Sequence, residues 1–402
     1  MSIPIQHLQK VDRTLGRAAL FALQPLVHLR HEETERRILV IKFWGLGSLQ
    51  LLSPALDALE AQYPGADIEL LTLRSNVEFV EGLGRFARVH SVDLRGAGWW
   101  RVAWRLARMA RALRRRRFAV VYDFEFFTCA SAAFAVLSGA PQSHGFHAPK
   151  SGRNVRLHTH RTTFNRYWHV ARNFRALAGG ENGRPVAPDE LSSFTVTARH
   201  SAELASLALE SGFDSTGPLV VLNPNAGSLS LERRWPAERF GLLAARLVEE
   251  AGARIVLIGA PNERERVEAV LRVAGPLPSE RVLDLSGRAS LGVAIAALAA
   301  ADVVVSNDSG PMHVAAALGT TTFGLFGPET PVMYEPLGIR TRTFYEPPSC
   351  SPCINVHDNK LSNCVKGFPE CLTNISVSRV FAAVLEELDG RRILDPNLVE
   401  KP

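Results

Sequence analysis

Short apolar runs alternate with stretches of helical periodicity along the first half of the chain. The apolar runs fall at residues 38–42, 68–73, 89–93 and 118–123. The helical patterns between them cover residues 51–62, 75–84 and 99–115. Because buried strands separated by helices are typical of a parallel sheet covered on both faces, we predict an α/β domain here. The pattern loosens over residues 145–160, and a helix is expected over 163–178.

A second series of the same kind follows a glycine-containing stretch at residues 179–185. Its apolar runs fall at 219–222, 254–258, 282–285, 303–305 and 321–326. The length of 402 residues suits about two domains of ordinary size. We therefore predict two doubly wound α/β domains in tandem. The predicted parts are an N-terminal arm at 1–37, a first domain at 38–180, a linker region at 181–216, a second domain at 217–375, and a C-terminal helix and tail at 376–402.

The most informative stretch is residues 302–328. The run Val303–Val305 predicts a buried strand, a polar turn at 307–310 follows, and a helix is expected from Met312 to Leu318. A tight turn of this kind points free backbone N–H groups and the positive end of the helix at one spot, which suits a phosphate. Asp308 and His313 flank that spot.

The sequence Asp-Ser-Gly-Pro-Met-His at 308–313 resembles the donor-site signature of glycosyltransferase family 9, which contains the ADP-heptose:lipopolysaccharide heptosyltransferases. Residues 223–227 followed by Arg-Arg-Trp-Pro at 233–236 are similar to the family's first donor loop, and residues 38–64 to its N-terminal opening. The resemblance covers residues 38–385. It implies the GT-B arrangement, in which two Rossmann-like domains flank a cleft, and a C-terminal helix that crosses back to the first domain.

The resemblance implies an inverting transfer of heptose from ADP-heptose to a lipopolysaccharide-core or related lipid-linked envelope glycan. Arg233 stands where the family usually has Lys and would neutralise the diphosphate; the alternative is a surface arginine before a helix. Glu263 would bind the ribose hydroxyls, and Glu265 is an alternative. The implied donor-binding residues are Asn225, Gly227, Arg233, Arg234, Glu263, Asp308, Ser309, Gly310, Pro311 and His313.

The first loop of the chain departs from the family pattern. The family carries Gly-Asp there, with the Asp as proposed base, whereas this chain has Gly47 and Ser48. A serine does not accept a proton at neutral pH without a partner. The alternative bases are Glu125 and Asp123 at the end of the fourth strand, with His144 behind them; Asp123 could instead cap the next helix. The acceptor-site candidates are Gly45, Gly47, Ser48 and His144.

The lost aspartate opens a second hypothesis, a catalytically inactive sugar-nucleotide-binding or scaffold protein of envelope glycan synthesis. A nicotinamide site is disfavoured, because Gln50 replaces the third glycine of the dinucleotide fingerprint and no acid ends the second strand. The second domain has no Asp-x-Asp after a strand, the pair that holds a divalent cation in other transferases, so metal-free donor binding without a cofactor is expected.

The net charge of +6 has a local source, because residues 99–117 hold eight arginines and no acid. Such an element attracts an anionic partner, and no nucleic-acid motif frames it. Three of the six tryptophans share the segment, and the arm at 1–35 adds a second amphipathic stretch. A crossover helix with a solvated basic face is the alternative. With no apolar span of ~20 residues and no secretory signal, we expect a cytoplasmic protein, peripheral on the inner face of the cytoplasmic membrane.

Four of the five cysteines are clustered near the C-terminus, at 350, 353, 364 and 371. The first pair has the spacing of zinc ligands, but the second pair is farther apart than in a standard zinc knuckle. A structural zinc site, buried reduced thiols and a disulfide all remain open on this spacing. Cys129 is expected to be an ordinary buried cysteine of a helix.

Overall fold

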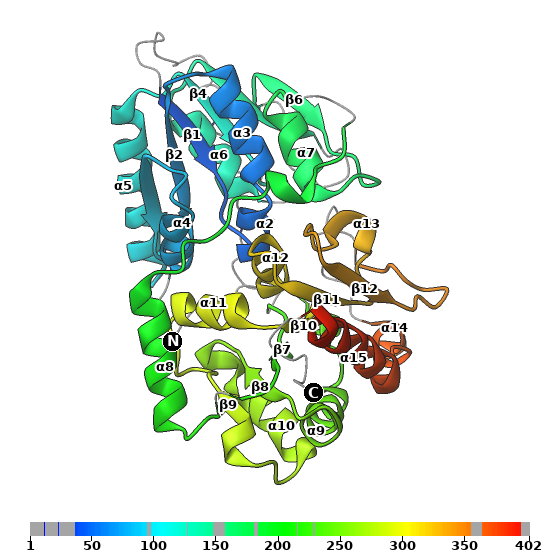
Figure 1. Ribbon diagram of the computed structural model, residues 1–402. Coiled ribbons are helices and arrows are strands. Elements are labelled where there is room, and N and C mark those ends of the chain that lie inside the picture. The colour runs from blue at the N-terminus through cyan, green and yellow to red at the C-terminus, as the bar shows by residue number, and fades with distance from the viewer. Residues whose placement is uncertain are drawn as a thin grey trace. The chain divides into compact units, whose positions relative to one another are not determined.

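The computed structural model describes residues 37–94, 98–126, 128–147, 157–180, 184–214, 216–227, 230–354 and 364–394, together with Asp12 and Leu23. The chain divides into two compact units. The first is Met1–Ser192 with Asn355–Leu361, and the second is Ser193–Ile354 with Ser362–Pro402. Each unit contains one six-stranded sheet with helices packed against it (Figure 1).

The sheet of the first unit is parallel throughout and has the order β3-β2-β1-β4-β5-β6. Its strands are β1 (Arg37–Ile41), β2 (Asp67–Leu73), β3 (Arg88–Val92), β4 (Val120–Asp123), β5 (Gln142–His147) and β6 (His160–Thr163). The adjacent central strands β1 and β4 are almost entirely buried, which agrees with their continuous apolar sequences. Their carboxyl ends therefore lie side by side, as expected at the switch point of a doubly wound sheet.

The helices of the first unit pack in two pairs, α3 with α7 and α5 with α6. Leu39 and Ile41 of β1 belong to the same core cluster as Leu113 of α5 and Phe134 of α6. The helices are α2 (Leu46–Gln50), α3 (Ser53–Gln62), α4 (Val77–Leu83), α5 (Trp99–Arg116), α6 (Cys129–Leu137) and α7 (Val170–Leu177), with 3-10 turns η2 (Arg74–Asn76) and η4 (Pro188–Glu190).

Two described residues of the N-terminal arm contact the first unit. The carboxylate of Asp12 accepts the backbone N–H groups of Cys129 (2.7 Å) and Ala130 (2.9 Å) at the start of α6. A carboxylate there satisfies helix amides that have no partner within the helix. Leu23 packs against the cluster that contains Ala132 and Val136. The rest of the predicted amphipathic arm lies outside the described residues.

The second sheet repeats the order of the first, β12-β11-β10-β7-β8-β9, and is again parallel. Its strands are β7 (Leu219–Asn223), β8 (Arg254–Leu257), β9 (Val282–Asp284), β10 (Val303–Asn307), β11 (Thr321–Phe326) and β12 (Thr341–Tyr345). The long helices are α8 (Ala198–Glu210), α9 (Ala237–Ala251), α10 (Arg264–Ala274), α11 (Leu291–Ala300), α12 (Gly310–Ala317) and α15 (Val377–Leu394). The short ones are α13 (Pro331–Tyr334), α14 (Glu370–Thr373), η5 (Leu231–Arg233), η6 (Pro261–Glu263) and η7 (Ser279–Arg281).

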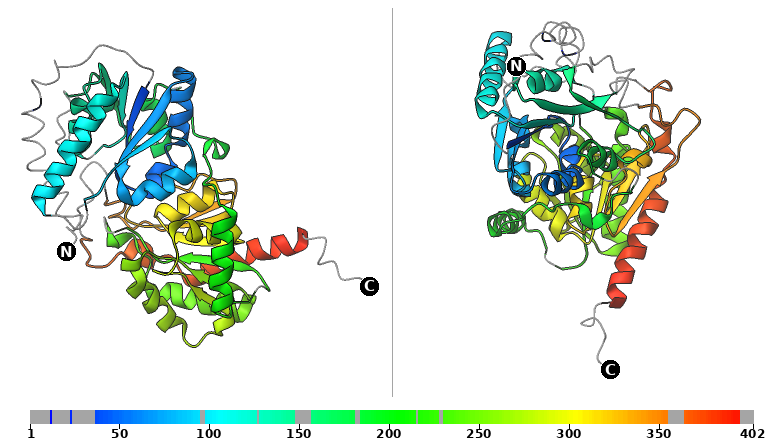
Figure 2. Two further views of the ribbon diagram at one scale, coloured as in Figure 1. Left: turned by 90° about the vertical axis from the view of Figure 1, so that its left-hand side faces the viewer. Right: turned by 90° about the horizontal axis from the view of Figure 1, so that it is seen from above.

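The core of the second unit is centred on Trp235, which is fully buried. Its ring meets Phe240 of α9 edge-on at 5.0 Å, and its Nε1 donates to the Ile375 carbonyl at 3.1 Å. The helix α15 packs on α9 and β10, all within the second unit. Figure 2 shows its C-terminal turns extending beyond the other helices of that unit. The helix α8, inside the predicted linker range, packs on α11.

The prediction of two doubly wound α/β sheets is confirmed, but three edge or near-edge strands were not predicted. The sequences of β5, β6 and β12 are Gln-Ser-His-Gly-Phe-His, His-Arg-Thr-Thr and Thr-Arg-Thr-Phe-Tyr, which lack a continuous apolar run. The helix expected over 163–178 covers only Val170–Leu177, because Thr163 belongs to β6 and residues 164–169 form a turn. No helix in the described part of the chain combines the length and apolar character that crossing a bilayer requires.

Candidate functional site

Two asparagine side chains fix the loops at the carboxyl ends of β7 and β10, which are neighbouring strands. The Asn223 amide donates to the hydroxyls of Ser306 (2.9 Å) and Ser309 (2.8 Å). On the other strand, Asn307 Oδ1 accepts the Trp235 backbone N–H at 2.8 Å. These buried bonds tie the first donor loop, the turn at 307–310 and the core tryptophan into one arrangement.

The turn leads directly into α12, which begins at Gly310 with Ser309 as its N-cap residue. The Ser309 side chain makes no capping bond to the helix, because its hydroxyl accepts from Asn223 and donates to the Asn307 carbonyl (3.1 Å). The first backbone amides of α12 are therefore not satisfied by that side chain. Ser309, Gly310 and Pro311 are partly exposed, so the positive end of the helix is open to an anion.

Arg233 reaches the same turn from the loop after β7. Its Nη1 donates to the Asp308 carbonyl (2.9 Å) and lies 3.3 Å from Asp308 Oδ2. Both side chains are buried, which overturns the alternative of a surface arginine. Within the described part of the chain, the buried Nε of Arg233 has no hydrogen-bond partner. A buried guanidinium with a spare donor is well suited to an anionic ligand.

Arg234 and Glu263 lie on the adjoining side of this loop, 3.9 Å apart. Arg234 donates to the Ala226 carbonyl through Nε (3.2 Å) and Nη2 (2.9 Å). Glu263 accepts the Ala260 backbone N–H at 3.0 Å, and burial raises the pKa of its carboxyl above the ordinary value. The alternative residue Glu265 is exposed on α10. The structure therefore groups Glu263, rather than Glu265, with the arginines.

His313 is buried in the first turns of α12. Burial is the main cause that lowers the pKa of its imidazole to about 4; the nearby Asp308 opposes this shift and the positive charge of Arg233 contributes to it. The ring is therefore neutral at physiological pH. Its Nδ1 has no partner among the described residues, so one ring nitrogen is available to a ligand.

Asn225 and Gly227 complete the predicted donor set. The Asn225 amide donates to the Ile258 carbonyl at 3.0 Å, and its buried Oδ1 has no partner among the described residues. Gly227 is exposed at the end of the loop. All ten predicted donor-binding residues thus belong to the second unit, in loops, 3-10 turns and the first turn of α12.

In the first unit, the loop between β1 and α3 contains the predicted acceptor residues. Gly45 has a φ of 85°, a left-handed conformation that favours glycine. A Cβ on Gly45 would lie 3.2 Å from the Ser48 hydroxyl, so the chain folds closely back on itself there. Gly47 is buried in the short helix α2, and Ser48 is partly exposed.

Glu125 lies directly beneath this loop and is fully buried. Its Oε1 accepts from Lys42 Nζ (2.7 Å), the Phe43 backbone N–H (2.7 Å) and the Trp44 backbone N–H (2.9 Å). Lys42 is equally buried, so the two form a buried ion pair between β1 and the end of β4. Three donors converge on one carboxylate oxygen and hold the loop in place.

Asp123 is also fully buried, and its alternative role as a helix cap is wrong. Its Oδ1 accepts the Glu125 backbone N–H at 3.0 Å, whereas the first amides of α6 are accepted by Asp12. Its Oδ2 lies 3.3 Å from His158 Nε2. The imidazole of His158 fits against β5 only because residue 145 is glycine, since a Cβ there would lie 2.4 Å from the ring.

His144 belongs to an aromatic stack that runs across the adjacent strands β4, β5 and β6. Its ring lies between those of Tyr122, with centroids 4.5 Å apart, and His160, 4.4 Å apart. Burial, with smaller contributions from the neighbouring His160 and His158, lowers the pKa of His144 to about 4. The residue is therefore a neutral, stacked ring that could support a sugar or donate a hydrogen bond.

Sequence reasoning missed five residues that shape these sites: Lys42, His158, Asn223, Asn307 and Arg266. Arg266 donates to the carbonyls of Pro224 (2.7 Å) and Trp235 (2.6 Å), and burial lowers its pKa to about 10. A charged or amide side chain at the end of an apolar strand could have marked Lys42, Asn223 and Asn307 as site residues. Nothing in the local sequence marks His158 or Arg266.

Comparison with known proteins agrees with this geometry. The family model described as glycosyltransferase family 9 (heptosyltransferase) matches residues 106–362. The chain is 30% identical over 176 residues to lipopolysaccharide heptosyltransferase 2 of Escherichia coli K12, covering 44% of this chain and 47% of that protein. The match thus spans about half of that curated relative.

Two solved structures share the fold across nearly their full length. One is the ADP-heptose lipopolysaccharide heptosyltransferase II of E. coli, with a TM-score of 0.68 and 21% identity over 89% of this chain and 99% of that one. The other is a family 9 glycosyltransferase of Veillonella parvula, with a TM-score of 0.70 and 22% identity over the same 89% and 99%. Both likenesses support the two-domain GT-B fold.

The neutral, buried state of His313 predicts a pH-dependent stability. In the unfolded chain its pKa returns to about 6.5, so the unfolded state binds a proton that the folded state refuses until pH falls to about 4. The contribution is present above pH 6.5 and is lost as pH falls toward 4; at pH 5 the loss is roughly 2 kcal/mol. Denaturant unfolding of wild type and H313Q at pH 7.5 and 5 should show a shallower pH dependence in the variant. Equal slopes would contradict the assignment.

Proposed function

Because the chain belongs to glycosyltransferase family 9 (heptosyltransferase), we propose that it transfers a sugar from a nucleotide diphosphate donor to a lipopolysaccharide-core or related envelope glycolipid. The observation that carries this proposal is the anion site of the second unit, where the open start of α12 lies beside the buried Arg233–Asp308 pair. A nucleotide diphosphate is the anion that this family's reaction requires. The donor assignment and the acceptor assignment are argued separately below.

The second unit supplies positive charge for the leaving diphosphate. As the bond from the anomeric carbon to the diphosphate breaks, negative charge develops on the departing oxygen. The positive end of the α12 dipole and the spare Nε of Arg233 would stabilise that charge. The neutral imidazole of His313 adds a hydrogen-bonding group without adding a charge. On this proposal, the protein's own donors stabilise the leaving group and no divalent cation is needed.

ADP-heptose is the donor that we propose, supported by the relatives named as lipopolysaccharide heptosyltransferases. Glu263 is partly exposed at the edge of the donor loops and has carboxylate oxygens for ribose hydroxyls. Arg234, 3.9 Å away, partly offsets the effect of burial, which raises the pKa of that carboxyl. The sugar itself would extend from the diphosphate at α12.

For the acceptor, we propose a single inverting displacement. The acceptor hydroxyl oxygen attacks the anomeric carbon, its proton passes to a base, and the diphosphate leaves with the bonding electrons. Glu125 is the carboxylate beneath the Ser48 loop and is our first candidate for the base, with Asp123 second. Gly45, Gly47, Ser48 and His144 would bind the acceptor. To take the proton, Glu125, which has no exposed surface here, must become accessible to the acceptor hydroxyl.

The second candidate function is a sugar-nucleotide-binding or scaffold protein that no longer catalyses transfer. The observation that favours it is the same ion pair: with Lys42 and two backbone amides on Oε1 and with no exposed surface, Glu125 has the contacts of a positioning residue. Ser48 at the family's Asp position adds to this argument. The two functions differ in whether sugar transfer occurs, which a direct assay decides.

We also propose that the protein works at the cytoplasmic face of the membrane, where a lipid-linked acceptor is concentrated. The helix α5 buries Val102 and Leu113 in the core and leaves Trp100 87% and Trp104 60% exposed. Arg101, Arg108, Arg111, Arg114, Arg115 and Arg117 are exposed along or directly after the same helix. Tryptophan beside arginine is typical of the zone of lipid headgroups.

A hollow of about 440 Å³ adjoins α5 and strengthens the case for an anionic headgroup. Three arginines, Arg74, Arg105 and Arg108, and one acid, Asp93, line it, and the guanidinium of Arg108 stacks on Trp104 at 4.8 Å. Of the eight arginines at residues 99–117, Arg105 and Arg116 bond to other parts of the first unit. Arg105 donates to the Asp93 carbonyl at 2.7 Å, and Arg116 pairs with the buried Glu69. The basic surface is therefore the exposed remainder of the helix.

For the donor site, we expect R233A to weaken ADP binding by about 10–100-fold, because it removes a charge-assisted bond. R233K keeps the charge and should retain most of the affinity. Isothermal titration of each variant with ADP, and of wild type with UDP, GDP and dTDP, is the measurement. R264A is the matched control, since Arg264 is exposed and pairs with Glu268. Unchanged affinity in a folded R233A protein would show that the diphosphate binds elsewhere.

For the base, we expect E125Q to reduce transfer from ADP-heptose by about 10²–10⁴-fold, because the amide does not accept the acceptor's proton. ADP affinity should be unchanged, and the melting temperature shows whether the variant folds. A full transfer rate in folded E125Q would exclude Glu125 as the base. If wild type binds ADP-heptose but transfers nothing, and S48D gains activity, the second candidate function is correct.

For the membrane surface, we expect vesicle binding that requires anionic lipid and falls with salt. Each arginine near the surface contributes ~1 kcal/mol, so changing Arg101, Arg108 and Arg111 to Gln should lower partition into phosphatidylglycerol vesicles on the order of 100-fold. The matched control changes three exposed arginines of the second unit, Arg199, Arg272 and Arg340, and alters net charge equally. Co-sedimentation that is equal with neutral and anionic vesicles, or equal losses in both triple variants, would contradict the proposal.

A further inference from the structure

The turn between β6 and α7 presents an aromatic side chain to solvent. Tyr167 is 80% exposed there, and the guanidinium carbon of Arg172 lies 3.9 Å from the ring centroid of the half-buried Trp168. Arg166, the residue before Tyr167, is exposed as well. A single exposed apolar side chain is common on protein surfaces and does not by itself mark a site. The construction of this turn and its place at the sheet edge do.

A buried asparagine holds the turn in one conformation. Asn173 of α7 is 1% exposed, and its Oδ1 accepts the Asn165 backbone N–H at 2.8 Å. Its Nδ2 donates to the Asn165 carbonyl at 2.9 Å and to the carbonyls of Trp168 and His169, each at 3.3 Å. The Asn165 side chain in turn accepts the Tyr167 backbone N–H at 2.9 Å. The backbone that carries Tyr167 is therefore fixed before a ligand binds, which lowers the entropic cost of binding.

The turn lies at the carboxyl edge of the first sheet, the edge that carries the candidate acceptor loop and base. Its first residue, Phe164, is buried against Phe126, with ring centroids 5.0 Å apart. Phe126 directly follows Glu125, just past the end of β4. Because β6 lies two strands from β4, the turn is on the order of 10 Å from Glu125 across the sheet. A sugar bound at the turn would be a neighbour of the sugar that reacts.

The same turn is set apart from the basic surface of α5. The helix α5 packs on α6 and on the edge strand β3, whereas α7 packs on α3 and β5. The strands β3 and β6 are opposite edges of the sheet, and Figure 1 shows α5 and α7 on opposite sides of the first unit. A flat bilayer that contacts the exposed tryptophans of α5 would therefore not reach Tyr167.

We propose that Tyr167, with Arg166 beside it, binds a saccharide unit of the acceptor glycan, a role that rests on the acceptor proposed above. The C–H groups on one face of a sugar ring are weakly positive and pack on the negative face of an aromatic ring. Arg172 already engages the ring of Trp168, so Tyr167 is the ring that is open to a ligand. Arg166 would attract the carboxylate or phosphate groups of an acidic envelope glycan.

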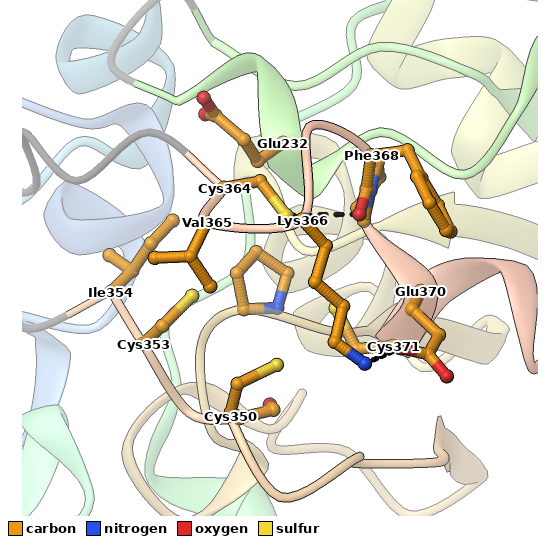
Figure 3. Close-up of a pocket in the computed structure, with 13 residues that line it drawn as sticks. Glu232, Cys350, Cys353, Ile354, Cys364, Val365, Lys366, Phe368, Glu370 and Cys371 are labelled. Atoms are coloured by element: carbon orange, nitrogen blue, oxygen red, sulfur yellow. Dashed lines mark hydrogen bonds and ion pairs between the residues drawn. The ribbon is translucent and has the colours of Figure 1, made fainter.

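Isothermal titration with lipopolysaccharide core oligosaccharide, freed of lipid by mild acid, tests this inference. We expect Y167A to weaken binding about 10-fold because the contact area of the ring is lost, whereas Y167F keeps the ring and should stay within about 2-fold of wild type. The matched control is F368A, which removes an exposed ring of the second unit beside the clustered cysteines (Figure 3). The four cysteines drawn there, all in the described part of the chain, form no disulfide, so F368A disturbs no cross-link. Wild-type affinity in Y167A, or equal losses in Y167A and F368A, would overturn the proposal.

Two further measurements separate this inference from the proposed function. In a transfer assay, Y167A should raise the KM for the acceptor about 10-fold and leave kcat within about 2-fold, because the ring binds a sugar away from the reacting atoms. Its affinity for ADP should equal that of wild type. An unchanged acceptor KM in an active Y167A protein would overturn this inference alone. If wild type neither binds the oligosaccharide nor transfers to it, the acceptor assignment is wrong as well.

Vesicle binding distinguishes a glycan contact from a lipid contact at this ring. We expect Y167A to partition into phosphatidylglycerol vesicles as wild type does, because the turn lies away from α5. A loss of vesicle binding in Y167A, with unchanged affinity for the oligosaccharide, would overturn the proposal in favour of a lipid contact.

Discussion

The buried asparagine network at the ends of β7 and β10 is the constraint on which the candidate donor site depends. Asn223 holds the hydroxyls of Ser306 and Ser309, and Asn307 holds the backbone of Trp235. With the Ser309 hydroxyl engaged there, the start of α12 is left without a side-chain cap. A helix end without its cap costs stability, so the chain keeps an unsatisfied terminus at the place where the family motif lies. The same network fixes the loop that carries Arg233.

The first unit is built on a different kind of interaction, a buried ion pair. Lys42 and Glu125 join the ends of the two central strands, and their desolvation is offset only because two backbone amides share the carboxylate. Removing one partner would leave the other charge buried alone. This arrangement holds the loop of Gly45 and Ser48 in a fixed position, and it does so whichever residue acts as the base. Rigidity at that loop is compatible with both functions proposed above.

The sequence predicted the architecture well where local patterns are strong. The strands predicted at 38–42 and 303–305 are continuous apolar runs, and the polar residues at 307–310 are typical of a turn. Hydrophobic periodicity and turn composition were therefore sufficient to predict these elements. The strand β5 was missed because its polar and histidine residues interrupt the apolar pattern while the neighbouring strands supply the pairing. The partners of Asp123 and Glu125 were missed for a related reason. His158 and Lys42 are distant in sequence from them, and only tertiary packing brings them together.

The cap of α6 has a consequence for the synthesis of the chain. Asp12 accepts an amide that follows it by 117 residues, so the contact cannot form until α6 has left the ribosome. At about 5–20 residues per second, the arm waits on the order of ten seconds for its partner. During that interval Leu23 has no folded surface to pack against, because its partners Ala132 and Val136 belong to α6. Formation of this contact therefore depends on the order of translation as well as on stability. Slow translation before residue 129 would lengthen the time for which Leu23 has no packing partner.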